Sequence, residues 1–274
     1  MTTQFEKGRL FRALHERAGA FVIPNPWDQG SARLLAHLGF EALASTSAGY
    51  AFSVGQLDNT IGRDRMMEHL GELVAATALP VSADLENGFG DDPEVVAETI
   101  RLGAEVGLAG GSIEDATGRA ESPLYDRELA AERIRAAAEA ARALPFTFTL
   151  TARAENYLVG RPDLADTIAR LQAYQEAGAD VLYAPGLTSV ADITSVVRSV
   201  DRPVNVLAGL HNAHLTVAEL SDIGVKRISV GGSLYRAALG AALRAGGEML
   251  RDGTFTFTRE AMSHRDVSAM LADG

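Results

Sequence analysis

Eight short β-type runs alternate with longer helical patterns along this chain of 274 residues. Such alternation is typical of parallel strands joined by crossover helices. Glycine stands where a helical pattern stops before the next strand, at Gly39, Gly107, Gly178 and Gly224, as left-handed helix caps require. The eight runs begin near Phe21, Ala42, Val81, Gly110, Phe146, Val181, Val204 and Arg227. Eight repeats of this unit predict an α/β fold of the (β/α)8 TIM-barrel type.

The segments between and beyond these runs complete the predicted organisation. Residues 93–106, 127–143 and 163–177 are rich in Ala, Leu and Glu and are long enough for crossover helices. Residues 1–20 are predicted to hold an extra N-terminal helix, and residues 254–274 a C-terminal helical extension. Because 47% of the residues are hydrophobic and no linker is evident, we expect residues 1–274 to form a single barrel domain.

An open, doubly wound sheet is the alternative arrangement for such alternation. That fold is expected to carry a Gly-x-Gly-x-x-Gly turn after its first strand. Pro24-Asn25-Pro26-Trp27-Asp28 stands at that place here. The sequence therefore favours the barrel.

Charge and composition exclude several classes of function. The formal net charge of -11 opposes binding to nucleic acid or to an anionic membrane. The chain contains no cysteine, which excludes disulfides, thiolate ligands and a catalytic thiol. Residues 1–20 carry charges throughout, and nowhere do about 18 apolar residues run together, so neither a signal peptide nor a membrane span is predicted. We expect a cytoplasmic protein that acts on a small molecule.

Two pairs of carboxylates stand at the ends of successive predicted strands. Asp84 and Glu86 end the run that begins at Val81, and Glu114 and Asp115 end the next run. Residues two apart on an extended strand point to the same side, so Asp84 and Glu86 are expected to aim at one spot, joined by Glu114. Carboxylates that close repel one another unless a cation or proton lies between them, and an all-oxygen set favours Mg2+ or Mn2+. The alternative is that each pair only begins the following helix.

Further polar residues follow other predicted strands, where the chemistry of a barrel gathers. Arg153 is suited to grip a carboxylate or phosphate with two hydrogen bonds, although an ion pair with Glu155 or Glu114 is the simpler alternative. Residues 45–49 read Ser-Thr-Ser-Ala-Gly, which suits an anion nest or only a turn. Asp58 either reaches inward to the metal or caps the next helix.

Weaker candidates stand at the remaining strand ends. Trp27 follows the first strand, and Asn205 lies one residue into the seventh. His211 and His214 follow the seventh strand, either as general acids or, more simply, as loop residues before a helix. Gly231-Gly232-Ser233 suits a phosphate site or a tight turn into the last helix, and we favour the turn.

Four ordered motifs lie within residues 8–250. They are Gly39-Phe40-Glu41, Ser82-Ala83-Asp84-Leu85-Glu86-Asn87-Gly88-Phe89-Gly90, Gly111-Ser112-Ile113-Glu114-Asp115 and Thr151-Ala152-Arg153-Ala154-Glu155. Together they resemble the isocitrate lyase and phosphoenolpyruvate mutase superfamily. The resemblance implies a barrel that binds Mg2+, with Mn2+ as the alternative ion, and that holds an α-keto acid or its enolate.

The resemblance also implies roles for individual residues. The predicted metal ligands, direct or through water, are Asp84, Glu86, Glu114 and Asp58. The predicted substrate contacts are Ser45, Thr46, Ser47, Ala48 and Arg153, to which we add Trp27. The predicted catalytic residues are Arg153, Asp58 and Glu114.

Two departures from the family pattern bear on the chemistry. The Asp-x-Asp of the family is Asp84-Leu85-Glu86 here, which lengthens one carboxylate arm. Lyase members carry a Cys in a gating loop after the Glu114 strand, and mutase members carry a Lys and an Asn, whereas residues 116–125 contain none of these. The candidates to replace them as acid, base or substrate contact are Thr117, Arg119, Glu121 and Tyr125.

These observations predict a Mg2+-dependent lyase that cleaves a carbon-carbon bond in a 2-hydroxy or 2-keto carboxylic acid and releases a keto acid. The alternatives are a phosphonopyruvate or phosphoenolpyruvate mutase or hydrolase, and a non-catalytic keto-acid binding protein. By resemblance, the chain is expected to form a helix-swapped dimer or tetramer in which residues 233–250 are exchanged. No nucleic acid or membrane partner is expected.

Overall fold

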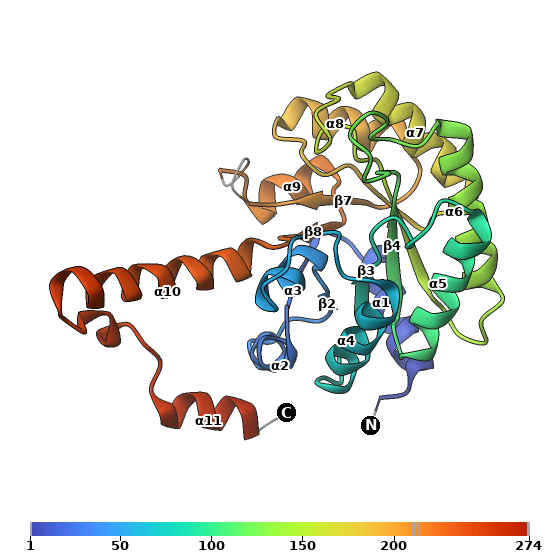
Figure 1. The fold of residues 1–274 in the computed structure, drawn as a ribbon. Helices are drawn as coiled ribbons and strands as arrows, with labels where there is room; N and C mark the ends of the chain where they lie inside the picture. Colours follow the sequence, from blue (N-terminus) through green and yellow to red (C-terminus); the bar gives the residue numbers. More distant parts are fainter. Residues whose placement is uncertain (1, 210–211, 213, 273–274) are drawn as a thin grey trace.

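The computed structural model describes residues 2–209, 212 and 214–272. Within them, eight parallel strands form a nearly closed barrel with eleven α-helices around or beyond it (Figure 1). The strands are β1 (Phe21–Ile23), β2 (Leu43–Ala44), β3 (Val81–Asp84), β4 (Gly110–Glu114), β5 (Thr149–Arg153), β6 (Val181–Tyr183), β7 (Val204–Leu207) and β8 (Arg227–Ser229). The predicted (β/α)8 barrel is confirmed. The fifth strand begins at Thr149 rather than near Phe146, because Thr149 pairs with Gly110, the first residue of β4.

Helices follow the strands in the order that the sequence predicted. They are α2 (Gln29–His37), α3 (Ser47–Ser53), α4 (Arg63–Ala75), α5 (Pro93–Glu105), α6 (Arg127–Arg142), α7 (Leu164–Ala177), α8 (Val190–Ser199) and α9 (Val217–Ile223). The four expected glycine caps are confirmed, since Gly39, Gly107, Gly178 and Gly224 have φ angles of 90°, 98°, 110° and 102°.

The barrel closes at a seam between β1 and β2. In the described residues the strand order runs β1-β8-β7-β6-β5-β4-β3-β2, which excludes the doubly wound alternative. The backbone N–H of Ala44 donates across the seam to the carbonyl of Pro24 (3.0 Å). The Asn25 side chain donates to the carbonyl of Ser45 and accepts from the N–H groups of Val230 and Gly231, each at 2.9 Å. Asn25 thereby joins the first, second and eighth strands.

Helix α1 (Gln4–Glu16) packs against the amino-terminal ends of the strands. Its Phe11 and Leu14 share a buried cluster with residues within or just before strands, namely Phe21, Ile23, Ala42 and Ala109. Gly8 allows this close approach, because a Cβ there would lie 2.1 Å from the carbonyl oxygen of Thr147. The helix expected within residues 1–20 therefore seals one end of the barrel.

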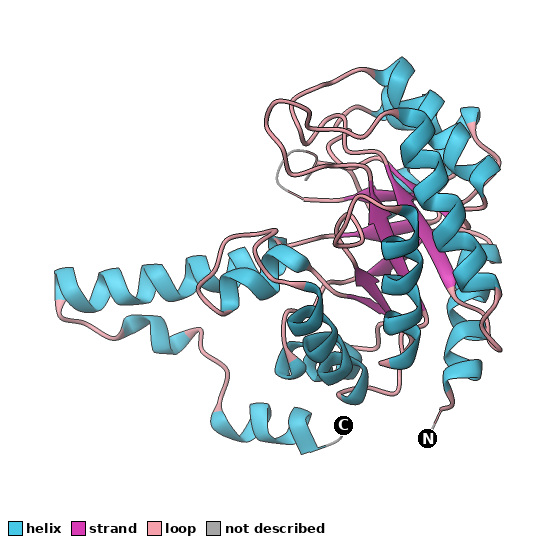
Figure 2. Cartoon of the chain, turned by 45° about the vertical axis from the view of Figure 1, so that its right-hand side comes forward, coloured by secondary structure: helices cyan, strands magenta, loops and turns pink. Residues whose placement is uncertain are grey.

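Helix α10 (Ser233–Asp252) extends away from the barrel as a long arm (Figures 1 and 2). None of its residues is buried. Beyond it, the short 3-10 helix η1 (Thr256–Arg259) and α11 (His264–Ala272) lead back, and Arg33 of α2 donates to the carbonyl of Leu271 (3.3 Å). None of the described helices combines the length and the apolarity that crossing a membrane requires.

Candidate active site

Five polar side chains lie in one row of paired residues around the barrel. The strand register pairs Glu114 with Arg153, Arg153 with Tyr183, Tyr183 with Asn205, and Asn205 with Arg227. All five line one cavity of about 390 Å3 inside the barrel. The cavity also contains the carboxylates at the carboxyl ends of the strands, where active sites of barrels lie.

Arg153 forms ion pairs with three carboxylates at the end of β5. Its Nη1 lies 2.8 Å from Oδ1 of Asp84, its Nη2 lies 3.0 Å from Oε2 of Glu114, and its Nε lies 2.9 Å from Oε1 of Glu155. Burial alone would lower the pKa of Arg153, but these carboxylates raise it well above its usual value. The structure thus shows the ion-pair alternative for Arg153, and its contact with substrate stays a prediction.

Asp84 ends β3 and is held by neighbouring serines. Oδ2 accepts hydrogen bonds from the hydroxyl (2.9 Å) and the backbone N–H (3.3 Å) of Ser47, and the hydroxyl of Ser45 accepts from the N–H of Asp84 (2.9 Å). Ser47 begins α3, whose N-cap is Thr46. The predicted segment Ser45, Thr46, Ser47 and Ala48 therefore lines the cavity, where it positions Asp84.

Glu86 lines a second, adjoining cavity rather than this one, and its backbone differs from the predicted one. Strand β3 ends at Asp84, and Glu86 has a φ of 50°, in the left-handed region that is costly for a residue with a side chain. The expected alternation along one extended strand is therefore wrong, because the chain turns after Asp84. Buried Oε1 of Glu86 has no hydrogen-bond partner in the described residues. Burial, with the charges of Asp84 and Asp58, raises the pKa of Glu86 to about 8.

Asp58 and Glu114 add two further carboxylates to the cavity that Asp84 lines. Burial raises the pKa of Asp58, the charge of Asp84 adds to this, and hydrogen bonding to Ser47 opposes it. Gly62 is the N-cap of α4, so Asp58 faces the cavity rather than capping that helix. Burial also raises the pKa of Glu114 well above its usual value, against the opposing charge of Arg153.

This donor set fits a hard divalent cation. Burial is the main cause of the raised pKa values of Glu86, Asp58 and Glu114, and the charges of neighbouring carboxylates add to it. A bound cation would offset both effects. No group of three or more such side chains in the described parts of the chain is already arranged around one metal position. Mg2+ suits such a site, because it usually keeps several waters and takes one or two carboxylates from the protein.

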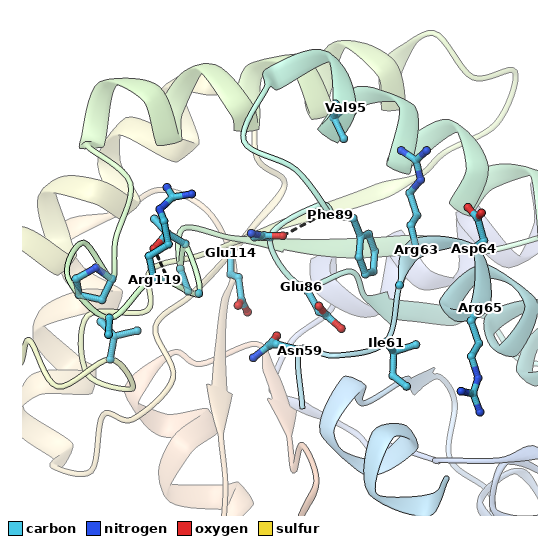
Figure 3. A pocket seen from close by; sticks show the side chains of 18 of the residues that line it. Asn59, Ile61, Arg63, Asp64, Arg65, Glu86, Phe89, Val95, Glu114 and Arg119 are labelled. Carbon is cyan, nitrogen blue, oxygen red and sulfur yellow. Dashed lines mark hydrogen bonds between the residues drawn. The ribbon is translucent and has the colours of Figure 1, made fainter. Parts of the chain in front are cut away.

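A wider cavity of about 1200 Å3 adjoins the first one. The two share Asn59, Glu114, Ala116 and Val159 in their linings. Figure 3 shows Glu86, Glu114 and Asn59 pointing toward its centre, with Arg63 and Arg119 at the edge. It provides the approach to the inner cavity.

The loop after β4 folds as a small hairpin beside the wider cavity. Ala116 and Leu124 form an antiparallel bridge, and Arg119 pairs with Asp91 (2.9 Å). Tyr125 donates to the same Asp91 (2.5 Å). Of the four candidates for the missing gating residues, Thr117 and Arg119 line the wider cavity, Tyr125 is turned to Asp91, and Glu121 is exposed.

Two predicted contacts lie elsewhere. Trp27 is absent from the described lining of the cavity and packs edge-on against Tyr235 of α10, with ring centroids 5.4 Å apart. The prediction that Trp27 contacts substrate is not supported by this placement. His214 is exposed, and His211 lies outside the described residues. Gly231 and Gly232 form the turn into α10, as favoured, and also line the cavity.

Sequence reasoning missed Arg227 and Tyr183, which line the cavity from β8 and β6. The sequence feature that could have identified them is a polar side chain at an inward-facing position of a buried strand. Arg227 and Ser229 alternate in this way along β8, on the same side as Asn205 of β7. This alternation identifies residues that face the cavity only once the strand register is known.

The comparisons with known proteins agree with this architecture. A crystal structure of a candidate lyase/mutase from Burkholderia cenocepacia J2315 is 66% identical, with a TM-score of 0.96 over 98% of this chain and 96% of that one. A crystal structure of 2,3-dimethylmalate lyase is 28% identical, with a TM-score of 0.86 over 98% and 95%. The oxaloacetate decarboxylase of Pseudomonas paraeruginosa (strain DSM 24068 / PA7) is 30% identical and aligns with 85% of this chain and 81% of its own.

A more distant structure shares the fold. Phosphonopyruvate hydrolase in complex with oxalate and Mg2+ is 23% identical, with a TM-score of 0.87 over 100% of this chain and 96% of that one. Proteins related to this chain by sequence thus include a decarboxylase, a lyase and a phosphomutase. Residues 11–250 match the sequence profile of phosphoenolpyruvate phosphomutase. Because that match covers most of the chain, the protein belongs to the phosphoenolpyruvate phosphomutase family, within the isocitrate lyase and phosphoenolpyruvate mutase superfamily.

Proposed function

We propose that the protein is a Mg2+-dependent lyase that cleaves a carbon-carbon bond in a 2-hydroxy or 2-keto carboxylic acid and releases a keto acid. The observation that carries this proposal is the convergence of Asp84, Asp58 and Glu114 in the inner cavity. Glu86 lines the adjoining wider cavity, and its buried Oε1 is unpaired among the described residues. Relatives named as a decarboxylase and a lyase support carbon-carbon chemistry.

Asp84 and Glu86 would hold the cation, with Asp58 and Glu114 in direct contact or bound through water. Bound there, Mg2+ would supply positive charge to the oxygen that becomes negative when a bond beside a keto group breaks. Arg153, whose Nη1 lies 2.8 Å from Oδ1 of Asp84, would bind a substrate carboxylate beside the cation.

The remaining residues position and shield the reacting groups. Ser47 fixes the direction of the Asp84 carboxylate, so the cation and the substrate would meet in one geometry. The hairpin of residues 116–124 borders the approach from the wider cavity, where Thr117 and Arg119 face an entering ligand. We assign proton transfer to or from the substrate to this hairpin, because the chain has no cysteine that could act as the acid or base.

A substrate panel tests the proposal. Malate, 2,3-dimethylmalate, oxaloacetate and phosphonopyruvate are each incubated with the protein in Mg2+ or in excess EDTA, and released keto acid is trapped as a hydrazone. We expect keto-acid release from a carbon-carbon substrate with Mg2+ and none with EDTA. Release of phosphate from phosphonopyruvate, or its isomerisation, would instead indicate carbon-phosphorus chemistry. Binding without turnover of any compound would indicate a keto-acid binding protein.

We further propose that α10 is exchanged between two copies of the chain in a dimer or tetramer. None of its residues is buried among the described residues, and beyond its first turn Leu243 and Leu250 are 68% and 92% exposed. Large exposed apolar patches mark interaction sites. The cytoplasmic location expected from the sequence stays a prediction.

A further inference from the structure

Arg227 is a second buried cation in the inner cavity. It begins β8, it is 5% exposed, and its side chain lines the cavity. Among the described residues that line this cavity, Arg153 and Arg227 are the two cations, and they occupy the same row of paired strand residues. Arg227 is therefore placed to act on whatever the cavity holds.

The two arginines differ in how their charges are compensated. Arg153 pairs with three carboxylates, whereas Arg227 forms no ion pair with any described residue. Its Nε donates to Oδ1 of Asn205 (3.0 Å), and Asn205 in turn donates to the hydroxyl of Ser229 (3.0 Å). This neutral chain of hydrogen bonds orients the guanidinium without neutralising it.

The remaining nitrogens of Arg227 have no partner among the described residues. The described residues accept no hydrogen bond from Nη1 or Nη2, and Nη1 is fully buried. A buried charge without a partner is energetically unfavourable, and a bound ligand of opposite charge would compensate it. Burial, with a contribution from the charge of Arg153, lowers the pKa of Arg227 to about 10, so the guanidinium stays charged at neutral pH.

We propose that Arg227 forms an anion subsite in the inner cavity and binds a carboxylate of the ligand, distinct from the group held beside Asp84 and Glu86. This inference rests on the proposed function, because it specifies how that site recognises its keto or hydroxy acid. The guanidinium favours carboxylate geometry, since it can donate two parallel hydrogen bonds. A cavity of about 390 Å3 lies in the size range of small-molecule sites.

Matched keto acids test the subsite. 2-Oxoglutarate and 2-oxopentanoate have the same chain length and differ in the distal carboxylate, so calorimetric titration of each with Mg2+ isolates that group. We expect the wild type to bind 2-oxoglutarate about 10- to 100-fold more tightly, as a charge-assisted hydrogen bond implies. In Arg227→Met that preference should disappear while 2-oxopentanoate binds as before. Arg227→Lys, which keeps the charge, should retain part of the preference.

Thermal unfolding separates this role from a structural one. Arg227→Met removes an uncompensated buried charge, so its Tm should equal or exceed that of the wild type, whereas a structural arginine would lower Tm when replaced. Equal affinity of the wild type for both acids, or equal loss for both in Arg227→Met, would overturn the inference while the proposed function stands. Failure of both acids to bind in a Mg2+-dependent manner would overturn both proposals. Should Arg227→Met not fold, the wild-type and Arg227→Lys comparison decides.

Discussion

At the scale of residues, two histidines are buried in an uncharged state. Nδ1 of His15 donates to the carbonyl of Phe11 (2.9 Å), and His69 stacks on Tyr50 with ring centroids 3.6 Å apart. Nε2 of each ring has no partner in the described residues. Burial lowers the pKa of His15 to about 3 and that of His69 to about 4. Both rings therefore resist protonation in the folded protein.

This predicts a pH dependence of stability with a definite sign. The unfolded chain takes up protons near the usual histidine pKa of about 6.5, before the folded chain does, so stability is complete above that pH and falls as the pH decreases. Between pH 7 and pH 5 each histidine should cost about 2 kcal/mol of unfolding free energy.

Urea unfolding at the two pH values measures this cost by difference. Between pH 7 and pH 5, the unfolding free energy of His15→Gln and of His69→Gln should each fall by about 2 kcal/mol less than that of the wild type. His264→Gln, at an exposed position, should behave as the wild type. Parallel pH profiles for all four proteins would show that the buried rings do not oppose protonation.

The site residues were predictable from sequence where a strand end alone places them. Asp84, Glu114 and Arg153 stand at the ends of β3, β4 and β5, as predicted. Glu86 lines the adjoining cavity instead, because the chain turns after Asp84, and its left-handed φ cannot be read from an Asp-Leu-Glu pattern. Its role as a metal ligand stays a prediction. Arg227 was missed because its inward direction depends on the strand register.

At the scale of elements, the strands and glycine caps follow from local patterns, whereas close packing between elements does not. Gly8 and Gly71 both lie inside helices, in α1 and α4, and their sequences do not distinguish them. A Cβ at Gly8 would meet the Thr147 carbonyl at 2.1 Å, whereas a Cβ at Gly71 would meet only ordinary contacts at 3.8 Å or more. Tertiary contact, rather than helix propensity, decides which glycine is required.

Alanine substitutions should separate the two glycines. Gly8→Ala should destabilise the protein by about 1–3 kcal/mol, because α1 must move away from the barrel end. Gly71→Ala should stabilise it by about 0.5–1 kcal/mol, because alanine favours a helix interior. Chemical unfolding of both variants checks this, and a Gly8→Ala protein as stable as the wild type would mean that α1 does not seal the barrel as described.

At the scale of the whole molecule, the outstretched α10 is the feature that a single barrel does not explain. Its residues Leu239 and Leu243 lie one turn apart and are 41% and 68% exposed. The sequence pattern predicted a helix there, and the structure adds that it leaves the barrel (Figure 2). In the proposed exchange a second chain covers this helix, and a local sequence pattern cannot specify such a contact.

The proposed exchange predicts a change of oligomeric state. Leu243→Asp should convert dimers or tetramers to smaller species in light scattering coupled to size exclusion, because it buries a charge in the proposed interface. Leu10→Asp, at a 54% exposed position on α1, serves as the control and should keep the wild-type assembly. An assembly unchanged by Leu243→Asp would argue against exchange through this face of α10.

The central claim is that the carboxylates of the inner cavity hold one divalent cation, and binding of Mn2+ followed by electron paramagnetic resonance tests it directly. We predict one Mn2+ per chain, displaced by Mg2+, with an affinity that falls at least about tenfold in Asp84→Asn. Glu132→Gln, an exposed carboxylate on α6, should bind as the wild type does. Absence of Mn2+ binding by the wild type, or equal binding by Asp84→Asn, would contradict the claim.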